Sequence, residues 1–262
     1  MPIWVRVALE AGEGFGTLER DGAVRLHHGD MFSAAIPTGT MLAPDAVRLV
    51  APVRPGKFIG LWNNFRELAA KQGNAIPTSP LFFLKSPSSI VGPEAPIRPP
   101  PDIGRVAYEG ELGIVIGRHC HDADEATASA AIFGFTCIND VTALDILTAD
   151  PGFAQWARAK SCDSFGPVGP AIATGLDWST LRVCTLLNGR ERQNYPASDM
   201  ILPPARIVSL LSREMTLEPG DLIACGTSLG VLPMRPGMVV EIAIDGIGTL
   251  RNPYAPPQET PP

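Results

Sequence analysis

Two stretches near the middle of the chain carry apolar side chains in the pattern of buried β-strands. In residues 108–117, Leu112, Ile114 and Ile116 alternate with small residues. Successive side chains on a strand point to opposite faces, so this period of two predicts a strand. Residues 132–138 form a second apolar run, rich in residues that favour strands. Residues 124–131 between them hold four alanines and few helix breakers, which predicts a short helix.

Two carboxylates stand at the start of the first predicted strand. Glu109 and Glu111 are two positions apart, so they share a face, which Val115 continues. Like charges beside an apolar core repel each other and stay ionised at low cost only with a positive group between them. A hard divalent cation such as Mg²⁺ or Ca²⁺, held by oxygen ligands, meets this need. The alternative is an ordinary strand end with two solvated glutamates.

A third carboxylate follows the second predicted strand. Asp140 stands where this apolar run ends, a common position for a ligand or catalytic group. Two glutamates and one aspartate make an open site with three oxygen ligands, and water and substrate would complete the octahedron. The sequence therefore predicts one Mg²⁺ or Mn²⁺ bound by Glu109, Glu111 and Asp140. His119 and His121 flank Cys120, a pattern able to bind Zn²⁺, but a solvent-exposed loop is the favoured interpretation there.

Composition limits the class of protein. The 262 residues are 45% hydrophobic and 18% charged, which suits one globular domain with a small appendage. The 26 glycines and 27 prolines favour many turns and short strands over long helices. A net charge of −6 without a basic run argues against nucleic-acid or membrane partners. The five scattered cysteines favour reduced thiols in a cytoplasmic protein, and we expect neither a membrane span nor a signal peptide.

The chain divides into three expected regions. Short alternating segments predict a small β-rich N-terminal region over residues 1–54, which ends near a proline-rich stretch. Residues 55–253 would form the main domain. Residues 254–262 are rich in proline and predict a flexible tail.

Several segments together resemble the fumarylacetoacetate hydrolase superfamily. The two glutamates and Asp140 lie in segments similar to its metal-binding signature, and further segments follow in the family's order at 160–170, 187–193, 217–227 and 246–252. The resemblance covers roughly residues 55–253. It implies an α+β, mostly β fold, with a mixed β-sheet roll around a divalent metal. It also implies homodimers and chemistry on 2-oxo or 1,3-dicarbonyl acids, by C–C hydrolysis, decarboxylation or keto–enol tautomerisation.

The resemblance also implies roles for polar side chains. Lys160 would contact substrate and stabilise a developing enolate, and Thr227 would bind a substrate carboxylate or carbonyl. Gln193 lies in the family's hairpin segment and is a further candidate for substrate binding. Lys85 would line the mouth of the pocket. A solvated lysine, a turn threonine and ordinary turn residues are the alternatives.

The chain departs from the family's pattern at the residues that activate water. The hydrolases carry a histidine and a glutamate where this chain has Leu68 and Lys71. Glu67 could serve as a base instead, although adjacent helix positions face about 100° apart. Arg66 could reach an anionic substrate, or Arg66, Glu67 and Lys71 could form the solvated face of an amphipathic helix.

Two further polar positions of the family are replaced by Leu144 and Leu147, so the substrate could be less polar, or these positions could simply pack. Hydrolysis needs a base, whereas decarboxylation and tautomerisation need little beyond an electron sink. The sequence therefore favours a decarboxylase or isomerase over a C–C hydrolase, with a catalytically silent metal-binding or ligand-binding protein as the third hypothesis.

Overall fold

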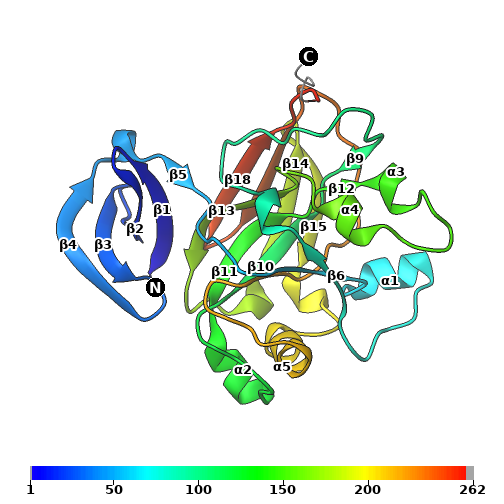
Figure 1. Ribbon diagram of the computed structural model, residues 1–262, viewed down its shortest axis with the longest axis horizontal. Coiled ribbons are helices and arrows are strands. Elements are labelled where there is room, and N and C mark those ends of the chain that lie inside the picture. Colours follow the sequence, from blue (N-terminus) through cyan, green and yellow to red (C-terminus); the bar gives the residue numbers. More distant parts are fainter. Residues whose placement is uncertain (1, 258–262) are drawn as a thin grey trace.

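The computed structural model describes residues 2–257 and is built mainly of strands. Its largest sheet has twelve strands, ten of them in the order β4-β3-β2-β1-β13-β11-β10-β16-β6-β7. The first four strands of the chain, β1 to β4, form an antiparallel meander at one side of the molecule (Figure 1). These strands are β1 (Ile3–Leu9), β2 (Gly12–Leu18), β3 (Val24–Asp30) and β4 (Ala34–Leu42).

The rest of the large sheet forms the centre of the body. Its path runs through β13 (Gly166–Ala173), β11 (Ile132–Asn139), β10 (Gly110–Ile116), β16 (Leu222–Ala224), β6 (Phe58–Trp62) and β7 (Leu81–Lys85). The short strands β5 (Leu49–Val50) and β8 (Ile90–Val91) pair with β1 and β13. The β16–β6 and β13–β8 pairs are parallel and the others antiparallel, so the sheet is mixed and the predicted fold class is confirmed.

Two smaller sheets and five α-helices complete the body. The four-stranded sheet has the order β15 (Arg190–Pro196), β14 (Arg182–Leu187), β17 (Val239–Ile244) and β18 (Gly248–Pro253), and β9 (Val106–Ala107) pairs with β12 (Thr142–Ala143). The helices are α1 (Arg66–Gln72), α2 (Glu125–Ala131), α3 (Leu144–Leu147), α4 (Trp156–Lys160) and α5 (Pro204–Glu214). Figure 1 shows α1, α3 and α4 on the side away from the N-terminal meander.

The alternation along β10 separates two hydrophobic cores. Leu112, Ile114 and Ile116 belong to the main core, which also contains Val183 and Ile242 of the four-stranded sheet. Val115, on the opposite face, belongs to a second core with Met31 and Phe58. The predicted strand and helix are confirmed, and the Asp124 side chain caps α2 by accepting a hydrogen bond from the Thr127 N–H at 2.8 Å.

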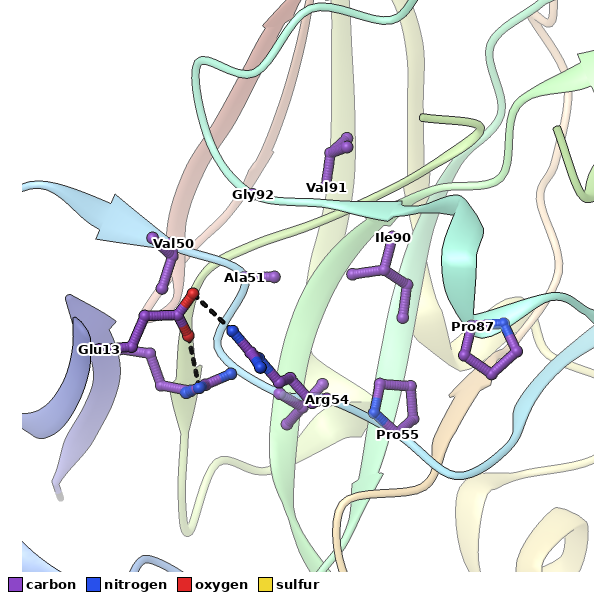
Figure 2. A pocket seen from close by; sticks show the side chains of 11 residues that line it. Glu13, Val50, Ala51, Arg54, Pro55, Pro87, Ile90, Val91 and Gly92 are labelled. Carbon is purple, nitrogen blue, oxygen red and sulfur yellow. Dashed lines mark hydrogen bonds and ion pairs between the residues drawn. The ribbon is translucent and has the colours of Figure 1, made fainter. Parts of the chain in front are cut away.

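An ion-pair group joins the meander to the segment that follows it. Glu13 on β2 accepts hydrogen bonds from Arg6 at 2.5 Å and from Arg54 at 2.7 Å, beside a cleft that Val50, Ile90 and other apolar residues line (Figure 2). At the other end of the chain, Tyr254 is buried and bridges to Ile97, so the expected flexible tail does not begin at residue 254. Residues 258–262 of that tail lie outside the described residues.

Candidate metal centre

The pairing of β10 with β11 brings the three carboxylates together. The start of β10 lies opposite the end of β11, with Glu111 across from Ile138. Glu109 precedes β10, and its carbonyl accepts a hydrogen bond from the Asp140 N–H at 2.9 Å. Oxygen atoms of Glu109, Glu111 and Asp140 all lie within 4.8 Å of one another. The sequence prediction that these side chains share one site agrees with this geometry.

Two buried lysines contact the carboxylates. Lys160 Nζ donates hydrogen bonds to Glu109 Oε2 at 2.8 Å and to Asp140 Oδ2 at 2.6 Å. Lys85 Nζ donates to Asp140 Oδ1 at 2.6 Å. Each lysine is only 2% exposed. Since three carboxylates face two ammonium groups, the fully ionised cluster carries an excess negative charge.

Burial and neighbouring charges act in opposite directions on these groups. Burial disfavours the charged form of Asp140, but Lys160 and Lys85 outweigh burial and lower the pKa of that carboxyl. Burial likewise opposes the charge of Lys160, but Asp140 and Glu109 raise its pKa above the usual range. For Lys85 burial prevails and lowers the pKa, although Asp140 partly compensates. Lys160 is therefore the group most firmly held as a cation.

Glu111 is the least satisfied member of the cluster. It is 1% exposed, and burial, Asp140 and Glu109 together raise the pKa of its carboxyl well above the usual value. Its Oε2 accepts a hydrogen bond from the Gly226 N–H at 2.7 Å, whereas its Oε1 has no partner among the described residues. A buried carboxylate oxygen without a donor is costly. The donor set and this unpaired oxygen both fit a hard divalent cation.

A pocket opens beside the cluster and is lined by both polar and apolar residues. Glu109, Lys160 and Thr227, three of the candidate site residues, line it. Leu68, Leu144 and Leu147, three of the positions at which the chain departs from the family's pattern, line it too. Lys85 lies deeper than the expected pocket mouth, because its side chain is fully buried against Asp140.

Gln193 and Thr227 are joined to the backbone next to Glu109. Thr227 Oγ1 donates to the Gly110 carbonyl at 3.0 Å and accepts from Gln193 Nε2 at 2.8 Å. Gln193 Oε1 accepts from the Gly110 N–H at 3.0 Å, and the side chain is buried. The resemblance implies a substrate contact for Gln193, whereas both ends of its amide bind protein atoms. In this structure Gln193 positions Thr227 and Gly110.

The first turn of α1 places its charged residues outside the pocket. Arg66 and Glu67 are exposed and are not among the residues that line it, whereas Leu68 is. The Glu67 N–H donates to Asp199 Oδ2 at 3.0 Å, so a side chain distant in the sequence caps the start of α1. The expected roles of Glu67 as a base and of Arg66 as an anion ligand stay predictions, and this geometry gives them no direct support.

Some residues at the site were not indicated by the sequence. Thr142 Oγ1 donates to Glu109 Oε1 at 2.8 Å, and Asn139 Oδ1 accepts from the Glu109 N–H at 3.1 Å. Both flank Asp140 in the chain, so their closeness to that carboxylate was the available signal. Trp62, Phe83 and Trp156 also line the pocket. They come from three separate segments, and no local pattern connects them.

Comparisons with known proteins agree with this architecture. Residues 57–254 match the family model described as fumarylacetoacetate (FAA) hydrolase C-terminal, and residues 4–52 match a model described as Rv2993c-like, N-terminal. Protein Rv2993c of Mycobacterium tuberculosis is 45% identical over 210 residues, which cover 79% of this chain and 78% of that protein. Among the described residues, no helix is long and apolar enough to cross a membrane.

Two solved structures are similar over nearly the whole chain. The structure of 2-hydroxyhepta-2,4-diene-1,7-dioate isomerase from Mycobacterium marinum has a TM-score of 0.90 at 38% identity, covering 99% of this chain and 100% of that one. The fumarylacetoacetate hydrolase from Exiguobacterium antarcticum has a TM-score of 0.84 at 32% identity, covering 98% of this chain and 100% of that one.

Proposed function

The chain belongs to the fumarylacetoacetate hydrolase family, and on that premise we propose that it is a divalent-metal-dependent enzyme acting on C–C bonds of a 2-oxo or 1,3-dicarbonyl acid. Isomerisation or decarboxylation is favoured over hydrolysis. The observation that carries the proposal is the group of half-buried Glu109 and buried Glu111 and Asp140, with one Glu111 oxygen unpaired among the described residues.

These three carboxylates are the residues that would hold Mg²⁺ or Mn²⁺. When bound, the ion would supply a Lewis acid that draws electron density from the substrate carbonyl. Lys85 and Lys160 keep Asp140 ionised, which leaves that group ready to act as a ligand. Thr142 fixes one oxygen of Glu109, and the Gly226 N–H fixes one oxygen of Glu111.

Lys160 is the candidate catalytic residue. Its ammonium lines the pocket and lies against Glu109 and Asp140, next to the place where a substrate carbonyl would develop charge. A fixed cation in a buried site stabilises an enolate more than water does, because it needs no reorganisation. Isomerisation moves a proton on such an enolate, and decarboxylation forms it as CO₂ leaves. Thr227 supplies a hydroxyl at the same pocket for a substrate oxygen.

Hydrolysis would need a further group that takes a proton from water. Leu68 faces the pocket where the family's hydrolases carry a histidine, and a leucine accepts no proton. Losing general-base help costs about 10²–10⁴ in rate. The named activity of the Mycobacterium marinum isomerase supports the favoured reaction. The Exiguobacterium antarcticum hydrolase keeps C–C hydrolysis as the second candidate.

Two assays run side by side test the reaction. Loss of oxaloacetate and cleavage of an acylpyruvate are measured with Mg²⁺ and with EDTA. We expect oxaloacetate loss to be faster and to stop in EDTA. Faster acylpyruvate cleavage would show that another residue supplies the base, with Glu67 the first to replace by glutamine. Turnover of neither substrate would favour a different 2-oxo acid or the catalytically silent alternative.

We also propose a homodimer. Strand β7 ends the order of the large sheet, and it exposes Leu81 at 42% and Leu84 at 48%. An open apolar edge strand is a ready surface for pairing with another chain. Light scattering at micromolar concentration should give twice the chain mass, and Leu84→Lys should shift it towards the monomer. A clean monomer mass for the unaltered protein would refute the dimer.

A further inference from the structure

The walls of the candidate active-site pocket are divided between two kinds of chemistry. Glu109, Lys160, Thr142 and Thr227 supply polar groups next to the carboxylate cluster. The other walls are apolar except for Asn63, whose side-chain amide is bound to Ala75 and Asn74. Their large side chains are Trp62, Leu68, Phe83, Leu144, Leu147 and Trp156. A ligand in this pocket would therefore meet hydrogen-bonding groups at one part of its surface and hydrocarbon at the rest.

The aromatic residues form one continuous group. Phe83 and Trp156 stack with ring centroids 5.3 Å apart and an angle of 11°, and Trp62 lies 6.1 Å from Trp156. Lys160 Nζ lies 5.0 Å from the centre of the Phe83 ring, so this group begins directly beside the polar side. Trp62 is 41% exposed, so the group reaches the surface. These rings could cover the tail of a ligand from the cluster outward.

The described residues that line the pocket offer no second cation. Lys160 is the only basic residue among those that line it, and Glu109 and Asp140 already bind its ammonium. Arg66 and Arg158 lie near Leu68 and Trp156 in the chain but do not line the pocket. A carboxylate placed against the leucines and aromatic rings would lose water without gaining an opposite charge, which is strongly unfavourable.

We infer that the substrate is a 2-oxo acid whose far end is a short aliphatic or aromatic group and not a carboxylate, and that Leu144, Leu147 and the aromatic group select this end. Oxaloacetate, whose second carboxylate is only one carbon away from the carbonyl, tests the reaction at the metal end and not this selection. The inference rests on the proposed function, since the metal site is taken to hold the 2-oxo acid end. It sets this chain apart from an enzyme for a dicarboxylate such as a 1,7-dioate, which carries a charge at both ends.

A matched pair of ligands tests the inference by calorimetry on the Mg²⁺-loaded protein. 2-Oxohexanoate and 2-oxoadipate have the same chain length and differ only in a terminal methyl or carboxylate. Oxalate is the third probe, because it offers the chelating end alone. Since one apolar group in a fitting pocket changes affinity by about 10–200-fold, we expect 2-oxohexanoate to bind about tenfold or more tightly than 2-oxoadipate.

The outcomes separate the two proposals. Equal or tighter binding of 2-oxoadipate, with oxalate also bound, would overturn the inference of an apolar far end and leave the proposed function standing. If none of the three ligands binds, the proposed function fails and the inference fails with it. Tryptophan fluorescence gives a second readout, because Trp62 and Trp156 line the pocket. It should change with 2-oxohexanoate far more than with oxalate.

A substitution in the apolar wall sharpens the test. Leu144→Arg places a cation among the apolar residues and should reduce or reverse the preference for 2-oxohexanoate by raising affinity for 2-oxoadipate. Leu232→Arg adds the same charge at an exposed leucine outside the pocket and should leave both affinities unchanged. An unchanged affinity ratio in a folded Leu144→Arg protein would contradict the inference. The ligand comparison on the unaltered protein decides the question if this variant does not fold.

Discussion

Two carboxylates in this molecule each lie between two basic side chains, but one is buried and the other is at the surface. Asp140 lies between Lys85 and Lys160, each at 2.6 Å, and its side chain is 1% exposed. Glu13 lies between Arg6 at 2.5 Å and Arg54 at 2.7 Å, and its side chain is 28% exposed (Figure 2). Similar distances therefore do not mean similar energies. Because the Asp140 group is buried, the loss of one of its charges would be costly. The Glu13 group is solvated, so the loss of one of its charges would cost little.

The difference follows from the dielectric around each group. Charges in a protein interior lose their hydration and depend on one another, so removing one leaves the rest unpaired. Charges at the surface are screened by water and salt, and each pair contributes little. Arg54, whose side chain is 73% exposed, can exchange Glu13 for water at almost no cost. Lys85 and Lys160 have no such alternative.

The largest effect should come from Lys160→Met in the metal-free protein. The substitution leaves three carboxylates with only Lys85, so we expect a loss of about 3–5 kcal/mol in the free energy of unfolding, measured in urea. Saturating Mg²⁺ should restore part of it, because the ion replaces the missing charge. Arg105→Met, which breaks an exposed pair with Asp145, is the control and should change stability little. Equal effects of the two substitutions would remove the contrast between buried and exposed groups.

Mg²⁺ or Mn²⁺ added to the unaltered protein should raise stability next most strongly. An ion that binds only the folded state stabilises it by about 2.7 kcal/mol at a hundred times its dissociation constant. Thermal unfolding with rising MgCl₂ measures this shift, and NaCl at the same ionic strength is the control. If both salts act alike, the ion does not bind the cluster specifically.

A smaller loss is expected for Thr142→Val. The hydroxyl donates to Glu109 Oε1 at 2.8 Å, and a hydrogen bond to a charged group contributes about 1.5–3 kcal/mol. The affinity for Mn²⁺ should also fall, because Glu109 loses the bond that orients it. Thr136→Val is a matched control at a buried threonine whose hydroxyl lies 3.4 Å from the Gly169 carbonyl. A larger loss from the control would contradict the importance of the Glu109 contact.

The smallest effect should be that of Glu13→Gln. Exposed ion pairs contribute about 0.2–1 kcal/mol, so the loss should lie in that range and disappear in concentrated NaCl. Denaturant unfolding at low and high salt measures it. A loss as large as that of Lys160→Met, or one that salt does not reduce, would show that the link between the meander and the following segment is more than a solvated contact.

Local rules predicted the parts of the carboxylate cluster, and the family resemblance indicated that they meet. Glu109 and Glu111 share a face through the period of two, and Asp140 follows an apolar run that pairs with their strand. The helix predicted over residues 124–131 also followed from neighbouring residues alone, and the structure shows Asp124 as its N-cap.

Contacts across the chain were beyond such rules. Nothing near Lys85 indicates that it lies against Asp140, 55 residues away, and the aromatic group needs β6, β7 and α4 in place before its members meet. Gln193 was assigned to substrate from the hairpin segment alone. Only the three-dimensional structure shows that its amide binds Gly110 and Thr227.

Calorimetric titration of Mn²⁺ into the metal-free protein tests the central claim most directly. The titration is repeated with Glu111→Gln and with the exposed Glu214→Gln, two variants that have the same net charge. The account predicts one ion per chain for the unaltered protein and for Glu214→Gln. It predicts a loss of binding for Glu111→Gln, whose unpaired buried oxygen argues most clearly for a cation. Equal Mn²⁺ affinity in all three proteins would contradict the assignment of Glu109, Glu111 and Asp140 as the metal site.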